Sequence, residues 1–272
     1  MNSFPYFFRA ATALALVAAA TTVKLVPVSA EDAAAPAAAC TAPADLVRLV
    51  NPLKRVAQRV AAGQPLTIVA IGSSSTAGAG ASSPAMNYPS RLAVELQAMY
   101  PNLSITVFNR GVNGEESRDM LERFDRDVFA QNPDLVLWQV GSNSVLRDRP
   151  LDEANTALRE GLNRLREAGS DVVLINPQYA PKVITKHDVD GMVDLIHLTA
   201  KETNVDLFER FAVMRYWRLT EDIPFSTFIS PDELHMNDWS YGCLAKLLAG
   251  AIHEAAARTT VTATVRDPAV RP

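Results

Sequence analysis

Three consecutive serines follow a short apolar run and are the first candidates for chemistry in this chain. Residues 66–71 read LTIVAI, and Gly72 then leads into Ser73, Ser74 and Ser75. A serine hydroxyl is a nucleophile only when a base takes its proton and when donors stabilise the oxyanion that forms. The stretch could therefore supply a nucleophile, hold a phosphate or form a flexible turn.

Phosphate binding is poorly supported by the glycines of this loop. A P-loop needs a Lys directly after its second Gly, and Ala79 follows Gly78 instead. A dinucleotide fingerprint that begins at Gly78 and Gly80 would need a third Gly where Ser83 stands. We therefore expect no nucleotide cofactor, and we expect no metal.

A base for a serine nucleophile is available among the four histidines. His235 lies three residues after Asp232, which can orient the imidazole if both residues sit in one turn before a helix. His187 lies in a polar loop, whereas His197 and His253 fall within predicted helices. His235 and Asp232 are therefore the candidate base and its orienting carboxylate.

Donors for an oxyanion are expected at the ends of two further strands. The backbone N–H of Gly111 and the side-chain amide of Asn143 could each face a cleft there. The elbow Gly-x-Ser-x-Gly of the α/β-hydrolases is absent, because Thr76 stands where its last Gly would be.

The elements that must position these residues alternate along the chain. Short apolar runs predict strands at 65–72, 104–109, 134–141, 171–176 and 205–208. Helical periodicity predicts helices at 46–60, 88–100, 117–132, 151–169, 190–203 and 238–257. This alternation predicts a parallel sheet with helices on both faces, in which ligands bind beyond the carboxyl ends of the strands.

Four segments of the chain, taken in order, resemble the SGNH hydrolase superfamily, the GDSL-type esterases and lipases. The first family block, Gly-Asp-Ser-x-Thr, is matched by Gly-Ser-Ser-Ser-Thr at 72–76. The other blocks are matched by Asn109, Gly111 and Gly114, by Gly-Ser-Asn-Ser at 141–144, and by Asp232 with His235. The resemblance covers residues 65–257.

This resemblance implies a fold and a set of roles. The fold is a three-layer α/β/α sandwich with a five-stranded parallel sheet, flavodoxin-like in its connections. Ser74 is the implied nucleophile, His235 the base and Asp232 the residue that orients it. The N–H groups of Ser74 and Gly111 and the amide of Asn143 are the implied oxyanion donors.

The implied reaction is ester hydrolysis through an acyl-enzyme. A short-acyl or O-acetyl ester of a carbohydrate or small polar molecule is the expected substrate; a lysophospholipase or thioesterase is an alternative. Ser73 and Ser144 replace two supporting aspartates of the family, so a non-catalytic envelope or polysaccharide-binding protein is a further alternative.

Four aromatic residues could stack on sugars. They are Trp138, Tyr179, Trp217 and Trp239. Trp138 lies in a predicted strand and is expected in the core. Tyr179 follows the fourth predicted strand and could form a wall of the cleft.

The N-terminal segment has the pattern of an export signal. An apolar run after Arg9 ends in a small-x-small pattern at Ala30, which predicts a signal peptide over 1–30 and a periplasmic or secreted protein. The alternative is a short membrane anchor, although about 20 apolar residues are needed to span a bilayer. The net charge is −4 and no dense basic run occurs, which argues against nucleic acid as a partner.

The remaining organisation is a linker over 31–43, a hydrolase domain over 44–258 and an extended or disordered tail over 259–272. The chain has two cysteines, Cys40 and Cys243. An even count in an exported protein predicts a disulfide, the alternatives being two unrelated thiols or acylation at Cys40.

Overall fold

The computed structural model describes residues 38–265, with side chains as far as residue 258. The predicted signal peptide over 1–30 and the first part of the predicted linker lie outside the described residues. The final seven residues of the predicted tail also lie outside them.

A five-stranded parallel sheet forms the centre of the fold, as predicted. Its strands are β1 (Leu66–Gly72), β2 (Ile105–Gly111), β3 (Leu135–Gln139), β4 (Asp171–Ile175) and β5 (Asp206–Phe208). Their order is β2-β1-β3-β4-β5, and every neighbouring pair is parallel. The central strand β3 is buried along its whole length: its first four residues are apolar, and its last, Gln139, is a buried polar residue. From β1 the sheet is extended first on one side, by β2, and then on the other, by β3, β4 and β5. This change of side places a crevice at the carboxyl ends of β1 and β3.

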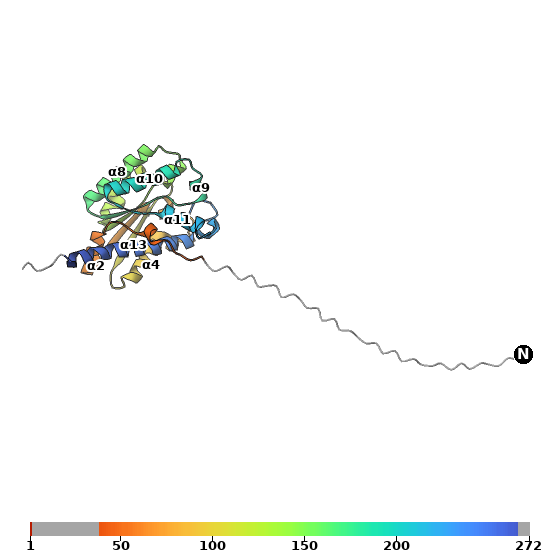
Figure 1. Cartoon of the computed structure of the whole chain (residues 1–272), viewed down its shortest axis with the longest axis horizontal. Helices are drawn as coiled ribbons and strands as arrows, with labels where there is room; N and C mark the ends of the chain where they lie inside the picture. Colours follow the sequence, from red (N-terminus) through yellow and green to blue (C-terminus); the bar gives the residue numbers. More distant parts are fainter. Residues whose placement is uncertain (2–37, 266–272) are drawn as a thin grey trace, which may run out of the picture. The chain divides into compact units, whose positions relative to one another are not determined.

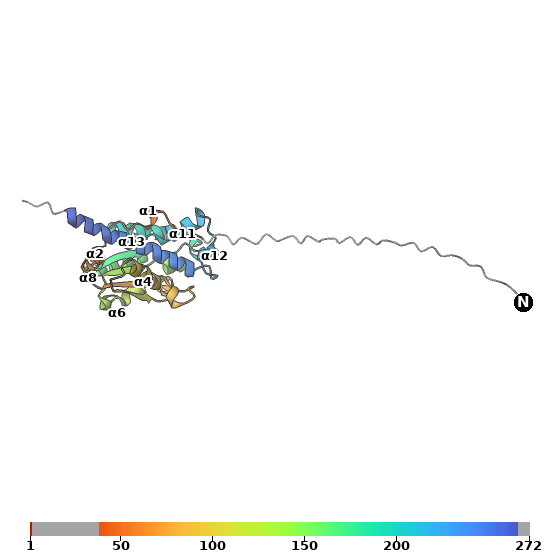
Figure 2. The same cartoon turned by 90° about the horizontal axis from the view of Figure 1, so that it is seen from below.

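Helices cover both faces of this sheet. Helices α8 (Leu151–Ala168) and α10 (Val189–Thr203) lie on one face (Figure 1). Helices α2 (Lys54–Ala62), α4 (Tyr88–Met99) and α13 (Asp238–Val265) lie on the other, where α13 crosses the view in Figure 2. The three-layer α/β/α prediction is therefore confirmed.

Shorter helices make the connections at the strand ends. They are α1 (Ala44–Val47), α3 (Ser74–Ala77), α5 (Ser117–Glu122), α6 (Phe124–Asp127), α7 (Ser142–Leu146), α9 (Pro181–Ile184), α11 (Arg210–Leu219) and α12 (Phe225–Phe228). Two 3₁₀ turns cover Pro84–Met86 and Phe129–Gln131. Helices α3 and α7 directly follow β1 and β3, so each begins at the carboxyl edge of the sheet.

Two predicted helices are interrupted. The helix predicted over 46–60 is divided into α1 and α2, because Pro52 disfavours a helical conformation at the residue before it. The helix predicted over 117–132 breaks at Arg123, whose buried side chain turns inward and donates to the carbonyl of Gly72.

The predicted extended tail is also partly wrong, because α13 continues to Val265. Its Thr and Val residues favour extended backbone, yet adding a residue to an existing helix costs far less than starting one.

The disulfide between Cys40 and Cys243 is present, with Cα atoms 5.4 Å apart. It fixes the segment before α1 to α13. The indole N–H of Trp217 also donates to the carbonyl of Thr41 at 2.8 Å. Residues 38–43 are therefore bound to the domain and are not a free linker, because two long-range contacts hold them.

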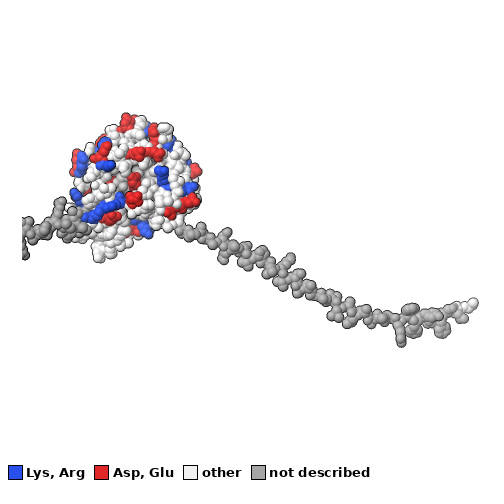
Figure 3. Space-filling model, in the orientation of Figure 1, with Lys and Arg blue, Asp and Glu red and all other residues white. Residues whose placement is uncertain are grey.

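Acidic and basic side chains are interspersed over the face of the molecule drawn in Figure 3. Among the described residues, no helix is both long and apolar enough to cross a membrane.

Candidate active site

Ser74, His235 and Asp232 meet at the carboxyl edge of the sheet. Ser74 begins α3, directly after β1, and its Oγ lies 2.8 Å from Nε2 of His235. On the other side of the ring, Nδ1 of His235 lies 2.5 Å from Oδ2 of Asp232. In this arrangement the imidazole can accept the serine proton while its Nδ1–H donates to the carboxylate.

Asp232 is held by more than the imidazole. Its Oδ1 accepts from the hydroxyl of Ser230 at 2.6 Å, from the N–H of Leu234 at 3.0 Å and from the N–H of His235 at 2.9 Å. Partial burial acts to raise the pKa of Asp232, but these hydrogen bonds and the one from the imidazole outweigh it and lower the pKa well below its ordinary value. The carboxylate therefore stays ionised, as a residue that orients a histidine must.

The loop that carries His235 packs closely on the loop after α3. Gly80 has φ of +87°, and a Cβ at this position would lie 2.3 Å from the carbonyl oxygen of Met236 and 3.0 Å from Cβ of His235. Any larger residue would push the histidine away from Ser74. The small residue at position 80 therefore makes room for the histidine loop.

Of the three adjacent serines, only Ser74 reaches the imidazole. Ser73 is buried, and its N–H and Oγ both donate to Oε1 of Gln139, at 2.9 and 2.8 Å. Ser75 is also buried, with its Oγ 3.4 Å from Oε1 of Gln178. Ser74 is partly exposed. The geometry therefore favours Ser74 as the nucleophile.

Gln178, which the sequence analysis missed, joins the serine turn to the histidine loop. Its Oε1 accepts from Ser142 Oγ at 2.8 Å and from Nη2 of Arg210 at 3.1 Å, as well as from Ser75. Its amide nitrogen donates to the carbonyl of Leu234 at 3.2 Å. The buried side chain of Gln178 thus links the turn that carries Ser74 to the loop that carries His235.

Arg210 lies fully buried beneath this network. Its Nε donates to the carbonyl of Asn176 at 2.9 Å, and no carboxylate pairs with its guanidinium among residues 38–258. Burial lowers the pKa of Arg210 to about 10, an effect that Tyr241 and Tyr88 partly oppose. The guanidinium remains charged at neutral pH, so Gln178 is held as an acceptor. An arginine at the start of a helix carries no sequence signal for such burial.

Asn143 is the second residue of α7, shortly after the carboxyl end of β3. Its Nδ2 donates to the carbonyl of Glu115 at 2.8 Å. A primary amide has two N–H bonds, so one remains to bind an oxyanion. The bond to Glu115 fixes the plane of the amide.

The structure does not support the predicted role of Gly111. Its N–H donates to Oδ1 of Asn109 at 2.9 Å and is therefore already used. A Cβ at Gly111 would lie 2.0 Å from the backbone nitrogen of Ala77, so the glycine is needed for close packing against α3. The N–H of Gly111 is occupied because the side chain of Asn109 folds back onto the end of β2.

Gly114, three residues later, is a better candidate for this donor. Its N–H has no hydrogen-bond partner among the described residues. The surrounding loop is fixed next to α7, because Arg147 donates to the carbonyl of Gly114 at 2.8 Å and Asn143 donates to Glu115.

Ser144, which replaces a family aspartate, lies against a carboxylate from another segment. Its Oγ donates to Oε2 of Glu116 at 3.2 Å, and Glu116 also accepts from Arg147 at 2.7 Å and from Arg149 at 3.3 Å. These bonds tie α7 to the start of α5. The position lacks an aspartate but keeps a network of charged groups.

The other predicted candidates lie elsewhere. His187, His197 and His253 bond to Asp188, Glu209 and Tyr100. Trp138 and Trp217 are fully buried, and Trp239 packs on Trp217 with ring centroids 5.0 Å apart, so the tryptophans are structural. Tyr179 stacks on Phe225 at 5.9 Å. Within the part of the chain described, no group of three or more His, Cys, Asp or Glu side chains could hold a metal ion.

Comparison with known proteins gives a consistent set of relatives. A model described as the Non-GDSL lipase-like family matches residues 39–258. An acetylxylan esterase of Geobacillus stearothermophilus is 37% identical over 94 residues, which are 31% of this chain and 43% of that protein. An arylesterase of Vibrio mimicus is 25% identical over 107 residues, 39% of this chain and 53% of that protein. The chain thus spans about half the length of these curated relatives.

A solved structure extends the similarity over more of the fold. The structure of Axe2, an acetylxylan esterase from Geobacillus stearothermophilus, superposes with a TM-score of 0.59 and 25% identity. The match covers 70% of this chain and 95% of that one.

Proposed function

Because the chain belongs to the Non-GDSL lipase-like family, we propose that it is a serine esterase that hydrolyses carboxylic esters through an acyl-enzyme. The observation that carries this proposal is the hydrogen-bonded series from Ser74 Oγ through the imidazole of His235 to the carboxylate of Asp232. Its relatives named as esterases support the same reaction class.

The first half of the reaction forms the acyl-enzyme. Ser74 Oγ attacks the ester carbonyl carbon while Nε2 of His235 takes the hydroxyl proton. Asp232 keeps the other ring nitrogen protonated and stabilises the imidazolium. The tetrahedral intermediate then collapses, the bond to the alcohol oxygen breaks, and His235 gives its proton to the leaving alcohol.

The second half releases the acid. His235 takes a proton from water, the resulting hydroxide attacks the acyl carbon, and the proton passes to Ser74 Oγ as the acid leaves.

Three donors are proposed for the oxyanion. The N–H of Ser74 lies in the first turn of α3, where no preceding carbonyl of the helix can accept it. The second amide hydrogen of Asn143 and the N–H of Gly114 complete the set. Donors of this kind stabilise the charge that develops in the transition state.

The proposed substrate is a short-acyl or O-acetyl ester of a carbohydrate. Both the matched sequence and the matched structure from Geobacillus stearothermophilus are named acetylxylan esterase, which supports this choice over a lysophospholipid or a thioester. We also propose that the protein works in the periplasm or outside the cell. The Cys40–Cys243 disulfide supports this location, since such bonds persist in oxidising compartments.

The test is hydrolysis of p-nitrophenyl acetate and acetylated xylan by the protein and by Ser74→Ala. Ser83→Ala, which removes an exposed hydroxyl from the same loop, is the matched control. We expect acetate release by the wild type and by the control, and its loss in Ser74→Ala. Release of acetate from neither ester by the wild type would favour the non-catalytic, carbohydrate-binding alternative.

A further inference from the structure

A pocket of about 390 Å³ lies among residues of α5, α7 and α8, and most of its lining side chains are polar. Its wall includes Glu116 and Ser144, which directly follow Glu115 and Asn143 in the chain. Asn143 donates to the carbonyl of Glu115. Each of these two wall residues is therefore the chain neighbour of a residue in that hydrogen bond, which holds the proposed oxyanion donor Asn143. The volume is within the range of about 300–1,000 Å³ that is usual for small-molecule sites.

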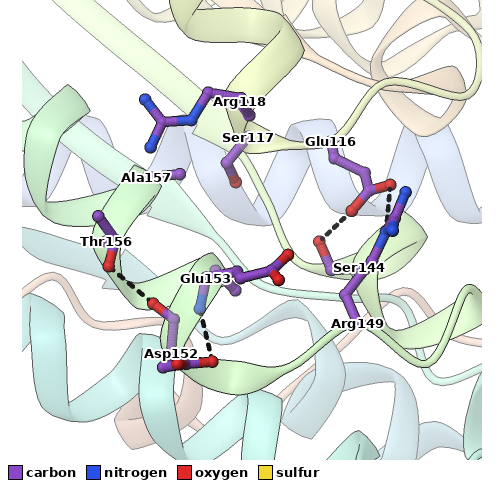
Figure 4. A pocket seen from close by; sticks show the side chains of 10 residues that line it. Glu116, Ser117, Arg118, Ser144, Arg149, Asp152, Glu153, Thr156 and Ala157 are labelled. Carbon is purple, nitrogen blue, oxygen red and sulfur yellow. Dashed lines mark hydrogen bonds and ion pairs between the residues drawn. The ribbon is translucent and has the colours of Figure 1, made fainter.

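Ser117 supplies a hydroxyl that the fold itself does not use. The residue is 6% exposed, and its Oγ has no hydrogen-bond partner within residues 38–258. Figure 4 shows the hydroxyl of Ser117 and the carboxylate of Glu153 pointing into the pocket from opposite walls, one from α5 and one from α8. The Ser117 oxygen is not one of the fully enclosed unpartnered polar atoms of the described residues, so it is open to the pocket and free to bond to a ligand or to water.

The start of α8 supplies two carboxylates, which can accept hydrogen bonds from a ligand. The carboxylate of Glu153 has no ion-pair or hydrogen-bond partner among the described side chains. Asp152 uses one carboxylate oxygen to accept the N–H of Glu153 at 3.0 Å. Free carboxylate oxygens in a pocket favour a ligand that donates several hydrogen bonds.

The pocket lining carries three carboxylates and two guanidinium groups, and one of the latter, Arg118, pairs with Glu160 outside the pocket. Glu116 is already neutralised by Arg147 and by Arg149 of the pocket wall. The carboxylates of Asp152 and Glu153 are left without ion pairs in the described structure, so a phosphate or carboxylate ligand would be repelled. A neutral polyol, by contrast, can donate to these carboxylates and accept from Ser117.

We propose that this pocket binds a neutral sugar residue of the esterified carbohydrate, next to the sugar whose ester is cleaved. The proposal rests on the proposed esterase function, because it assigns the pocket to the alcohol part of the same substrate. It makes Glu153 and Ser117 binding residues for the carbohydrate chain. A single acetylated sugar would leave the pocket empty, so the pocket favours oligomers over monomers.

Kinetics with two esters test this assignment. Glu153→Gln and Ser117→Ala should each lower kcat/KM for acetylated xylotetraose about tenfold more than kcat/KM for p-nitrophenyl acetate, mainly through KM. Glu167→Gln is the matched control, since Glu167 is an exposed carboxylate near the other end of α8. The control should leave both values unchanged. Equal losses on the two esters, or no loss in either pocket variant, would overturn the proposal.

Binding without turnover separates this proposal from the proposed function. Calorimetry with unacetylated xylotetraose and mannotetraose is run on Ser74→Ala and on Ser74→Ala combined with Glu153→Gln. Binding that weakens about tenfold in the combined variant supports the pocket even if the wild type hydrolyses no ester, in which case only the esterase proposal fails. Binding of neither sugar, or equal binding by both variants, would contradict the assigned pocket.

Discussion

Nε2 of His235 lies 2.8 Å from Oγ of Ser74, although 161 residues separate them in the chain. Helix α3 fixes the serine at the end of β1, and Asp232 fixes the histidine before α13. The two loops also touch directly at Gly80, where the histidine loop approaches too closely for a side chain. The pair is therefore set by the fold before any substrate arrives, which is the condition for preorganised catalysis.

Asn143→Ala is expected to lower kcat for p-nitrophenyl acetate by about 10²–10³, because one oxyanion donor is lost. KM should change little, since the donor acts mainly on the transition state. Asn102→Ala is the control, because Asn102 is an exposed amide distant from α7 in sequence. A change in KM with kcat preserved would assign Asn143 to ground-state binding instead.

Gln178→Leu is expected to lower kcat and to destabilise the fold by about 2–4 kcal/mol, because Ser75, Ser142 and buried Arg210 lose their common acceptor. Gln178→Glu keeps the acceptor and places a charge beside the guanidinium, while it removes the donor to Leu234.

Comparing these two variants separates stability from positioning. Gln178→Glu should unfold at a denaturant concentration at least as high as the wild type, yet still lose kcat because the histidine loop is released. Full activity in Gln178→Glu would show that the bond to Leu234 does not position the histidine.

The hydrogen-bonded carboxylate of Asp232 predicts a pH dependence of stability. Its pKa in the folded protein lies below its ordinary value, near 4 in an unfolded chain. The stabilisation is therefore complete above about pH 4 and is lost as the pH falls toward the folded-state pKa. Urea unfolding of wild type and Asp232→Asn should differ most at neutral pH, with a gap that shrinks below about pH 4. A gap that stays constant down to pH 3 would refute this linkage.

Removing the disulfide through Cys40→Ala with Cys243→Ala should lower the free energy of unfolding by roughly 2–5 kcal/mol, because the cross-link closes a long loop in the unfolded chain. The two cysteines are 203 residues apart. Denaturant unfolding measures the loss. Adding a reductant should shift the wild type but not the double variant, and equal shifts would assign the effect to another cause.

Much of the fold was predictable because the buried parallel strands are short and consist mostly of apolar residues. The apolar runs of β1 and β3 indicate that these strands are buried. The helices between successive parallel strands indicate right-handed crossovers. The breaks at Pro52 and Arg123 differ in kind. The proline carries a local signal, whereas the break at Arg123 depends on a side chain that reaches the distant carbonyl of Gly72.

The site was predictable where its residues have local signatures. Asp232 and His235 share one turn, and the serine turn follows a strand. Gln178 and Arg210 carry no such signature, because their roles arise from contacts between segments far apart in the chain. The assignment of Gly111 failed for a local reason, since whether its N–H is free depends on the rotamer of Asn109.

The central claim is that Ser74 is the activated nucleophile, and covalent labelling tests it most directly. The protein is treated with a fluorophosphonate and the modified residue is located by peptide mass spectrometry. We predict an adduct on Ser74 that forms far more slowly in His235→Ala. An adduct on Ser73 or Ser75, or ester hydrolysis by a protein that never labels at Ser74, would contradict it.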